Sequence, residues 1–573
     1  MSIVFMALVG RLTYLAVIKG AEYKQLALKQ WTKTIKMAPK RGTIMGSNGS
    51  NLALNEDVYR VDIDLNVFKR YLMAEKIPEV KAAYQLSQKL NIQSSTVEKI
   101  LDSKDNKGMP LQFVFLKRKV EKDMIDNVKA LKYDGLIISR DVDRVYPNNN
   151  LLSHVIGHTN SEGNGVGGVE QIYNKELAGI PGVKVAEVDR NNNELPYTEA
   201  TTVQPVDGKD LTLTIDEQIQ ELAEKVASET LSENGAKSVS ITIMNPKNGE
   251  ILAMASTPDY NPNKPYAEGK TDSEIQETWK NRAISNVFEP GSIFKVMTAA
   301  AALQNNVVND NDRFMSNGSI VVGNTTLYND NKEDYGIETF SDIIKNSDNV
   351  GFVKLGQKIG KENFYKFAKE AGFGQKTGID LPGESTGLIK NLKNIKPIDL
   401  ATMSFGQGVA VSQVQYMAAF NAVANGGAWI RPHVMKEISH MVNDKKVVDK
   451  QYDNLSKKTI ISSGNSANLR TYLERVVKEG TATSTYMEGY HIAGKTGTAN
   501  KVNSTTGGYE SGKYIASFAG MAPAKDPKVT LIVTIEEPNS TKYYAAQTAV
   551  PAARKLFLGL FTILNISPDK VRD

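Results

Sequence analysis

Three short motifs in this sequence carry residue types that can transfer an acyl group through a serine. They are Ser292-Ile-Phe-Lys295, Ser347-Asp-Asn349 and Lys495-Thr-Gly-Thr498, in this order along the chain. A serine hydroxyl is a weak nucleophile until a base removes its proton, and a neutral lysine can be that base. The second motif adds a hydroxyl and an amide, and the third adds an ammonium and two more hydroxyls. We expect the three motifs to meet in one groove.

The first motif stands at the start of a predicted helix. Glu289-Pro-Gly291 ends the preceding structure, and an Ala-rich apolar run over residues 296–303 follows. Lys295 comes three residues after Ser292, so it lies on the same helix face, one turn deeper. Burial and a nearby cation both lower the pKa of a lysine, and Lys495 is the candidate cation. We predict Ser292 as the nucleophile and Lys295 as its base.

The second motif falls in a loop between two predicted helices, at residues 340–346 and 350–359. Such a loop can direct a hydroxyl and an amide into a cleft. We predict that Ser347 relays a proton to the leaving amine, and that Asn349 holds the substrate amide and Lys295. The structural alternative is a plain helix cap at Ser347 or Asp348.

The third motif lies in a strand-like run. Alternation along a strand places Thr496 and Thr498 on one face, and Gly497 lets a ligand approach the backbone. The ammonium of Lys495 and the two hydroxyls suit a substrate carboxylate. The backbone N–H groups of Thr498 and Ser292 together predict an oxyanion hole, a feature that contributes about 3 to 4 kcal/mol per donor in well-studied enzymes.

Partial copies of each motif occur elsewhere, and their surroundings argue against them. Ser567-Pro-Asp-Lys570 lies in a polar tail, and Lys376-Thr-Gly378 runs into a loop sequence. Further Ser-x-Asn matches begin at Ser232, Ser463 and Ser466. His154 and His158 have a spacing that suits a metal, but the segment lacks the glutamate of a zinc-protease helix and contains a glycine. We therefore predict no metal site and no cofactor.

Composition narrows the class of protein. A chain of 573 residues exceeds one ordinary core, so two or three domains are expected. The net charge of +5 is small for this length, and no Lys/Arg stripe interleaved with aromatic residues occurs, so nucleic-acid binding is not expected. The chain has no cysteine, which removes disulfides, thiolate metal sites and cysteine nucleophiles together.

The first residues are apolar but short. Two apolar runs, over residues 3–9 and 12–18, flank Arg11. A membrane-spanning helix needs about 20 predominantly apolar residues, and a signal peptide needs a basic start and a small-residue cleavage site. We predict the outer end of a membrane anchor whose beginning precedes this sequence. The alternative is a short buried helix.

Periodicity predicts mixed secondary structure along the rest of the chain. Helices are expected at residues 22–36, at 217–231 after a cap at Asp216, and at 545–564. Strands are expected at residues 59–65, 210–215, 491–499, 514–522 and 529–535. Successive strands joined by short turns and mixed with helices indicate an α+β fold, with an antiparallel sheet covered by helices.

The sequence resembles the class B penicillin-binding proteins, the monofunctional transpeptidases of bacterial cell-wall synthesis. The likeness covers nearly the whole chain. It rests on the three motifs and on Arg41-Gly-Thr-Ile44, Asn48-Gly49, Leu52-Ala-Leu-Asn55, Gly168-Val-Glu170, Glu289-Pro-Gly291, Asp380-Leu-Pro-Gly-Glu384, Gly406-Gln-Gly408, Ala424-Asn-Gly-Gly427 and Ser517-Phe-Ala-Gly520. The family usually has an Asp-Arg pair before Asn48, where this chain has Gly46 and Ser47.

The resemblance implies a domain order and an activity. The domains would be a partial membrane anchor over residues 1–19, an elongated mixed pedestal (dimerisation) domain over 20–204, a transpeptidase domain over 205–565 and a polar tail over 566–573. The enzyme would be a single-pass cell-membrane protein with its catalytic domain on the extracytoplasmic side. Its substrate would be the D-alanyl-D-alanine end of a peptidoglycan stem peptide. β-Lactam antibiotics would be trapped on Ser292, and proteins of the wall-synthesis machinery would be partners.

Two other classes of protein share parts of this pattern: an enzyme that is a β-lactamase or a carboxypeptidase, and a non-enzymatic β-lactam sensor or scaffold. A class A β-lactamase uses a glutamate to activate water, and no Glu-x-x-Leu-Asn segment lies between the second and third motifs. A β-lactam sensor would need several membrane spans and a cytoplasmic effector. A scaffold role through the pedestal is compatible with catalysis. Labelled penicillin separates these classes through a stable adduct, rapid turnover or no adduct.

Overall fold

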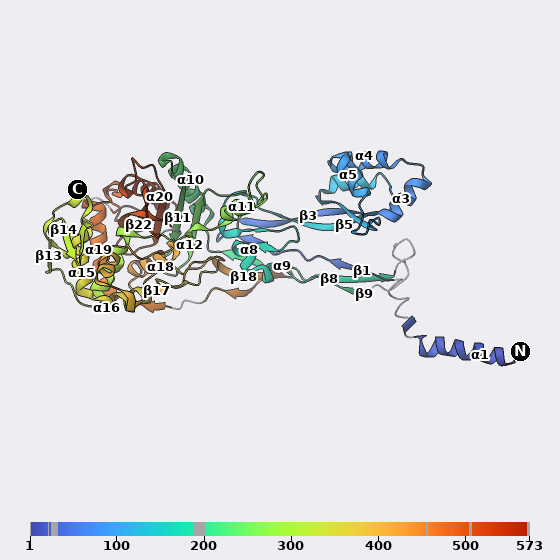
Figure 1. The fold of residues 1–573 in the computed structure, drawn as a ribbon, viewed down its shortest axis with the longest axis horizontal. Helices are drawn as coiled ribbons and strands as arrows, with labels where there is room; N and C mark the ends of the chain where they lie inside the picture. Colours follow the sequence, from blue (N-terminus) through green and yellow to red (C-terminus); the bar gives the residue numbers. More distant parts are fainter. Residues whose placement is uncertain are drawn as a thin grey trace. The chain divides into compact units, whose positions relative to one another are not determined.

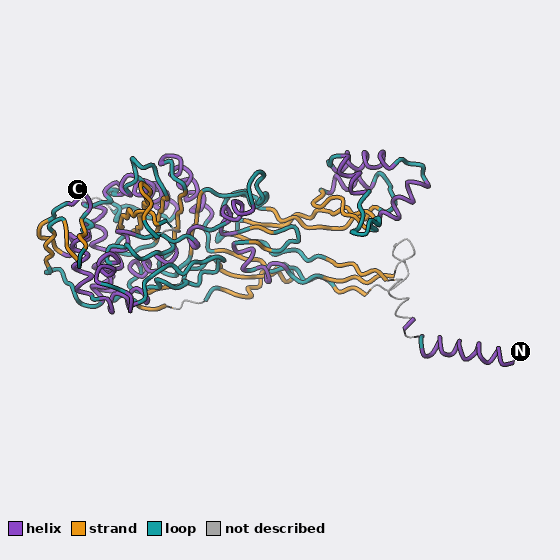
Figure 2. The backbone as a smooth tube through the Cα atoms, viewed as in Figure 1, coloured by secondary structure: helices purple, strands orange, loops and turns teal. Residues whose placement is uncertain are grey.

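The computed structural model of the chain describes residues 2–20, 22–23, 32–187, 201–453, 457–503 and 507–569. These residues form two compact units, and each unit combines segments that are distant in the sequence. Unit 1 comprises Met1–Thr43, Leu54–Val145 and Lys175–Lys209, and unit 2 comprises Ile44–Ala53, Tyr146–Asn174 and Asp210–Asp573. Both units contain helices and strands (Figures 1 and 2), so the fold is α+β as predicted.

Unit 1 is built around the long strand β3 (Asn51–Asp64), which pairs antiparallel with β4 (Phe113–Val120) and β5 (Leu136–Val145). Val61 and Ile63 alternate with polar neighbours along β3 and are fully buried. Four helices enclose this apolar face: α3 (Leu65–Ala74), α4 (Glu79–Leu90), α5 (Ser94–Leu101) and α6 (Lys122–Lys129). The Asp64 carboxylate caps α3, accepting from Asn66 N at 3.1 Å and Val67 N at 3.2 Å.

A three-stranded sheet in unit 1 corrects one prediction. Strand β1 (Thr32–Met37) pairs with β8 (Gly182–Glu187), which pairs with β9 (Thr201–Val203). The helix predicted over residues 22–36 is therefore wrong at its end, and residues 24–31 lie outside the described residues. Residues 32–37 read Thr-Lys-Thr-Ile-Lys-Met, so three of the six are β-branched residues, which favour strands. Pairing with a strand some 150 residues away outweighs the helix propensity of such a short segment.

The chain begins with helix α1 (Ser2–Thr13) and a π-helical turn η1 (Tyr14–Ile18). The side chains of Ile3, Phe5 and Val17 are 83%, 71% and 73% exposed, so this segment is not the buried helix of the alternative interpretation. None of the helices in the described residues combines the length and the hydropathy needed to cross a bilayer. The membrane anchor stays a prediction.

Unit 2 contains a five-stranded antiparallel sheet with the order β12–β11–β23–β22–β21. Its strands are β11 (Ser238–Met244), β12 (Ile251–Thr257), β21 (Ala493–Val502), β22 (Tyr509–Ala522) and β23 (Val529–Glu536). The β21 strand carries the third motif and lies at the edge of the sheet, so within the described part of the chain one side of its backbone has no strand partner.

Helices cover both faces of this sheet (Figure 1). Helix α18 (Gln413–Ala424) packs on one face, where Gln413 accepts a hydrogen bond from Thr242 and donates to Thr534. Helix α20 (Ala549–Ile563) packs on the other face, where a side chain at Gly520 would meet the Phe557 ring at 3.1 Å. Helix α10 (Glu217–Asn234) contacts α20 and begins at the predicted cap, Asp216.

The third motif lies on β21 itself, while the first two motifs lie among short elements beside the sheet. These are η2 (Gly291–Phe294), α13 (Lys295–Gln304), α14 (Phe340–Lys345), α15 (Asn349–Ile359), and two strand pairs, β13 (Arg313–Ser316) with β16 (Gly336–Thr339) and β14 (Ser319–Val322) with β15 (Thr325–Tyr328). The other elements of unit 2 are β2 (Ile44–Met45), α7 (Ser153–Ile156), β6 (His158–Thr159), β7 (Gly165–Val166), α8 (Gly168–Ile172), β10 (Asp210–Leu213), α11 (Asp272–Trp279), α12 (Arg282–Ser285), η3 (Asp330–Lys332), α16 (Lys361–Glu370), η4 (Leu392–Asn394), α17 (Pro397–Met403), β17 (Ala428–Ile430), β18 (Met435–Val442), β19 (Lys445–Gln451), β20 (Lys457–Thr459), α19 (Ser463–Glu479), η5 (Thr483–Thr485) and η6 (Ala545–Gln547). A further short helix, α9, spans Asn174–Ala178.

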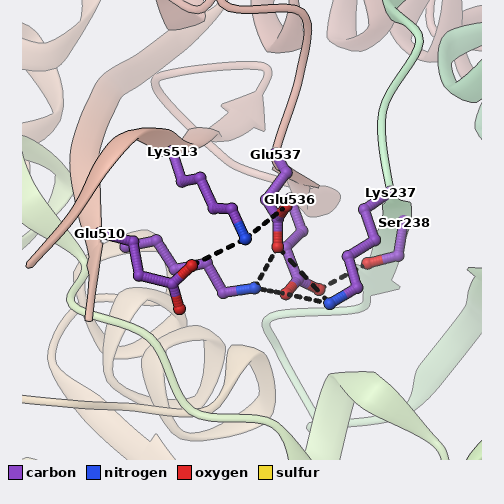
Figure 3. A network of polar contacts seen from close by, with 7 residues as sticks. Lys237, Ser238, Glu510, Lys513, Glu536 and Glu537 are labelled. Atoms are coloured by element: carbon purple, nitrogen blue, oxygen red, sulfur yellow. Dashed lines mark hydrogen bonds and ion pairs between the residues drawn. The ribbon is translucent and has the colours of Figure 1, made fainter. Parts of the chain in front are cut away.

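A network of ion pairs joins the strand ends of this sheet (Figure 3). Lys501 on β21 contacts Glu536 at 2.6 Å and also pairs with Glu537, while Ser238 on β11 donates to Glu536 at 2.8 Å. The other members are Lys237, Glu510 and Lys513. Because a network ties several strands at once, it fixes the end of β21 more firmly than an isolated exposed pair would.

Candidate active site

Ser292 lies on the turn η2, which leads directly into helix α13. Gly291 before it has φ +54°, and its N–H donates to Gly406 O at 3.0 Å. A Cβ at Gly406 would stand 2.0 Å from Gly291 O, so a glycine is required for this approach. On the other side, Tyr416 donates to Ile293 O at 2.8 Å. The serine is half-buried on a backbone turn held from both sides.

Lys295 begins α13, and only 1% of it is exposed. Its Nζ donates to Ser347 O at 2.6 Å, to Ser347 Oγ at 3.1 Å and to Asn349 Oδ1 at 2.7 Å. The structure thus brings the first and second motifs together, with the hydrogen bonds of the lysine directed at the Ser347–Asn349 loop.

Lys495 approaches the same hydroxyl from β21. It is fully buried, and its Nζ donates to Ser347 Oγ at 2.8 Å and to Thr496 O at 3.3 Å. One serine oxygen therefore joins the ammonium groups of the first and third motifs. Within the part of the chain that the structure describes, neither lysine forms an ion pair with a carboxylate.

The two lysines lose protons more readily than exposed lysines do. Burial lowers the pKa of Lys295 to about 7, although the negative charges of Asp348 and Asp330 oppose the shift. Burial also lowers the pKa of Lys495 well below its usual range, and the charge of Lys295 lowers it further. The sequence argument expected the charge of Lys495 to lower the pKa of Lys295. Burial is instead the largest cause for both lysines, and the charge effect is that of Lys295 on Lys495.

The Ser347–Asn349 turn links α14 to α15, as the sequence predicted for this loop. Ser347 has φ +59°, a left-handed backbone that is uncommon for a residue with a side chain. Asp348 caps α15 by accepting from Gly351 N at 3.0 Å. Asn349 donates from Nδ2 to Tyr328 O at 3.0 Å, which leaves its Oδ1 for Lys295. Asp348 thus caps the helix, while Ser347 and Asn349 bond to the lysines, so the predicted polar loop and the alternative helix cap are both present in these three residues.

The hydroxyls of the third motif already have protein partners. Thr496 Oγ1 and Thr481 Oγ1 are 2.7 Å apart, and Ala545 N donates to Thr498 Oγ1 at 3.0 Å. A Cβ at Gly497 would lie 2.8 Å from Pro290 O. Glycine is therefore needed there for the approach of the serine turn to β21, in addition to any approach by a ligand.

A cavity of about 630 Å³ collects the predicted residues. Its lining includes Ser292, Ser347, Asn349, Thr496, Gly497 and Thr498 from the three motifs. Lys295 and Lys495 are not in the lining; they lie buried behind Ser347. Reasoning from the sequence missed a further set of lining residues: Tyr328, Asp330, Tyr335, Gln407, Thr481, Tyr514, Tyr543 and Tyr544. Tyr514 and Tyr543 stack with ring centroids 3.9 Å apart, and nothing in their local sequence marks them.

The discarded motif copies lie elsewhere. Lys376 and Ser567 are exposed, and neither lines this cavity. His154 and His158 are buried, and burial lowers the pKa of each to about 4, so both are neutral. His154 Nε2 lies 3.0 Å from Thr278 O. No group of three or more metal-ligating side chains occurs within the described residues.

Comparison with known proteins identifies the class that this fold and site define. Residues 239–558 match the penicillin-binding protein transpeptidase domain, and residues 36–213 match the penicillin-binding protein dimerisation domain. The chain is 34% identical to stage V sporulation protein D of Bacillus subtilis, over 99% of this chain and 85% of that protein. It is 30% identical to the peptidoglycan D,D-transpeptidase FtsI of Escherichia coli, over 98% and 90% of the two chains. This chain belongs to the class B penicillin-binding proteins, which are peptidoglycan D,D-transpeptidases.

Solved structures have the same fold. A peptidoglycan synthetase from Bifidobacterium adolescentis superposes with a TM-score of 0.73 at 25% identity, covering 95% of this chain and 98% of that one. Penicillin-binding protein 3 of Mycobacterium tuberculosis, solved with ampicillin, gives a TM-score of 0.69 at 23% identity, covering 94% and 98%. The predicted fold class and enzyme class are both confirmed.

Proposed function

We propose that this enzyme cross-links stem peptides through an acyl-enzyme on Ser292. The observation that carries the proposal is the meeting of Lys295 and Lys495 at Ser347 Oγ, behind a cavity that Ser292 and residues 496–498 line. The arrangement offers a nucleophile, a base that is partly neutral near pH 7, and a hydroxyl between two amines.

In the first step, Lys295 takes the proton of Ser292. A neutral amine has two N–H groups and one lone pair, and two of the contacts of Lys295, Ser347 O and Asn349 Oδ1, can only accept hydrogen bonds. Donating to these two leaves the lone pair free to accept a proton. Ser292 Oγ then bonds to the carbonyl carbon of the penultimate D-alanine, and the N–H groups of Ser292 and Thr498 stabilise the oxyanion.

The leaving group departs through the second motif. The C–N bond breaks, and the amine of the terminal D-alanine receives a proton through Ser347 Oγ, which both lysines contact. Thr496 and Thr498 hold the terminal carboxylate beside Lys495, where a negative charge favours the protonated form of the lysine. An amino group of a neighbouring stem then attacks the ester carbonyl, and the proton of that amine returns to Ser292 by way of Lys295.

A β-lactam would follow the same first step and remain bound to Ser292. The test is incubation of the protein with labelled penicillin, followed by peptide mapping. We expect one stable adduct per chain in the wild type, none in Ser292→Ala and an unchanged adduct in Ser567→Ala, which alters the exposed serine of the discarded motif copy. Rapid release of hydrolysed penicillin would indicate a β-lactamase instead, and the absence of an adduct would leave a scaffold role.

We also propose that the N-terminal segment attaches the enzyme to a membrane. The exposed side chains of Ile3, Phe5 and Val17 support this, because apolar surface of this kind favours lipid over water. Sedimentation with anionic lipid vesicles tests the proposal. The full chain is expected to sediment and a chain lacking residues 1–19 to stay in solution, and equal sedimentation of the two would refute it.

A further inference from the structure

Two buried carboxyl groups lie at the Ser347–Asn349 turn: Asp348 is part of the turn, and Glu338 lies next to it. Asp348 is fully buried, and its two oxygens accept from Ser316 Oγ at 2.9 Å and Gly351 N at 3.0 Å. Glu338, on β16, is 3% exposed, and its Oε1 accepts from Asn346 Nδ2 at 2.6 Å. Its Oε2 is buried and, among the described residues, has no hydrogen-bond donor. Two contacts place Glu338 beside Asp348: Asn346, which donates to Glu338, comes two residues before Asp348, and Ser316, which donates to Asp348, lies on β13, the strand that pairs with β16.

Two carboxylates in contact in a buried site cannot both be ionised without a large repulsion, so one of them keeps a proton. Asp348 is the ionised partner, because it receives two donors and stands at the N-terminus of α15, where the helix dipole favours a negative charge. Glu338 is the protonated partner. Burial and the charge of Asp348 raise the pKa of Glu338 to about 8.

Glu338 forms no ion pair with a cation among the residues that the structure describes. Asp342 on α14 and Tyr335 before β16 face it, together with Asp348. The cations of this region are directed at Asp342, which contacts Arg475 at 3.2 Å and Lys345 at 3.6 Å. A proton on Oε2 is therefore what allows this side chain to remain buried beside Asp348.

We propose that Glu338 is a positioning residue: it donates a hydrogen bond from its protonated Oε2 to Asp348 and thereby holds the Ser347–Asn349 turn against Lys295. The turn needs such support, because Ser347 has φ +59° and two lysines depend on its oxygens. Loss of the proton would place a second negative charge beside Asp348. That charge would push the turn apart and, like Asp348 itself, raise the pKa of Lys295, so less of the base would be neutral.

The inference rests on the proposed role of Lys295 and the Ser347–Asn349 turn, and its test compares three variants by the pH dependence of acylation. Glu338→Gln keeps an acceptor for Asn346 and places an NH₂ donor opposite Asp348 at every pH. Glu338→Ala removes the donor. Glu224→Gln is the matched control, since Glu224 is also a partly buried glutamate with its pKa raised to about 7, but it lies on α10 and bonds to Leu152 N. The measured quantity is the second-order rate constant for labelled penicillin between pH 6 and 9.5.

We expect the wild-type and Glu224→Gln rate constants to fall above pH 8, approaching a tenfold loss per pH unit. Glu338→Gln should match the wild type within about threefold at pH 7 and lack this fall. Glu338→Ala should be at least tenfold slower at pH 7. If Glu338→Ala does not fold, as judged by circular dichroism, the Glu338→Gln profile alone decides.

An unchanged alkaline fall in Glu338→Gln would overturn the inference, as would a folded Glu338→Ala with wild-type rates. A wild type that forms no adduct at any pH would instead refute the proposed function, so the two failures are distinguishable. The melting temperature offers a second readout. A glutamate with a raised pKa destabilises the fold as pH rises from 4.5 towards 8, so that part of the decline should be absent from Glu338→Gln.

Discussion

The pKa of Lys295, near 7, predicts the pH dependence of acylation in quantitative terms. In the proposed mechanism Lys295 acts as the base in its neutral form, so the rate of acylation should follow the neutral fraction of this lysine. A lysine with the usual pKa of about 10.4 is neutral in roughly 4 × 10⁻⁴ of molecules at pH 7. With its pKa lowered to about 7 by burial, Lys295 is neutral in about half of them. Burial therefore increases the neutral fraction of the lysine at pH 7 about a thousandfold, which is equivalent to ~4 kcal/mol.

The assay is the rate of labelling by fluorescent penicillin at pH 5 to 9, with the adduct on Ser292 separated on a gel. The pKa of the base is lowered, so the active form is lost as pH falls through about 7. We expect the rate constant to rise about tenfold per pH unit below pH 6.5 and to level off between pH 7 and 8. Lys295→Ala should be slower by about 10² to 10⁴ at pH 7, and its rate should lose the steep dependence below pH 6.5.

Lys376→Ala is the matched control, because it removes an exposed lysine of the discarded Lys-Thr-Gly copy and should leave the profile unchanged. A wild-type rate that still climbs tenfold per pH unit between pH 7 and 9 would mean that Lys295 keeps the pKa of an exposed lysine. A rate that is flat from pH 5 would mean that no lysine acts as the base. Either result would refute the argument from burial.

Four further substitutions, one of them a control, test the packing and a helix cap. Gly406→Ala should slow acylation at least tenfold, because the new Cβ would stand 2.0 Å from Gly291 O. Gly408→Ala is the control: this glycine also has a positive φ, but its Cβ would be 3.6 Å from the nearest atom, so the acylation rate should fall less than threefold. Equal rates in the two variants would contradict the packing argument. Leu86→Ala should lower the free energy of unfolding of unit 1 by about 2 to 5 kcal/mol, measured by hydrogen exchange, with acylation unchanged. Asp64→Ala should lower the same free energy of unfolding by about 1 kcal/mol, because helix α3 loses its cap. A loss of acylation in Leu86→Ala or Asp64→Ala would contradict the expectation that the stability of unit 1 does not affect the active site.

Local signals explain why much of unit 2 is predictable from the sequence. The alternating runs predicted as strands at residues 491–499, 514–522 and 529–535 lie within or overlap β21, β22 and β23. The cap at Asp216 is confirmed, since its carboxylate accepts from Gln218 N at 3.0 Å and Ile219 N at 3.2 Å. In each case a few adjacent residues contain the whole signal, and the structure adds only the order of the strands.

Features that depend on distant partners could not be predicted in this way. Strand β1 needs β8, and its sequence alone is compatible with a helix. Glu338 is an ordinary polar residue of a short strand until the fold places Asp348 beside it. The tyrosines of the cavity are likewise defined by position: Tyr328 and Tyr543 come from segments more than 200 residues apart. The candidate nucleophile and lysines were predictable because their roles require particular residue types in fixed short motifs.

Lys295 differs from other partly or fully buried cations of this protein in its hydrogen-bond partners, and the proposed role of the lysine as a base explains the difference. Arg118 pairs with both oxygens of Asp141 at 2.8 Å, and Lys501 pairs with Glu536, as partly buried ions ordinarily do. Lys295 has neutral oxygens as partners instead. A carboxylate in contact with Lys295 would favour its charged form and raise its pKa, which would remove the neutral base. A general base made from lysine must therefore be buried without a counter-ion, and the surrounding fold has to supply the stability that this arrangement costs.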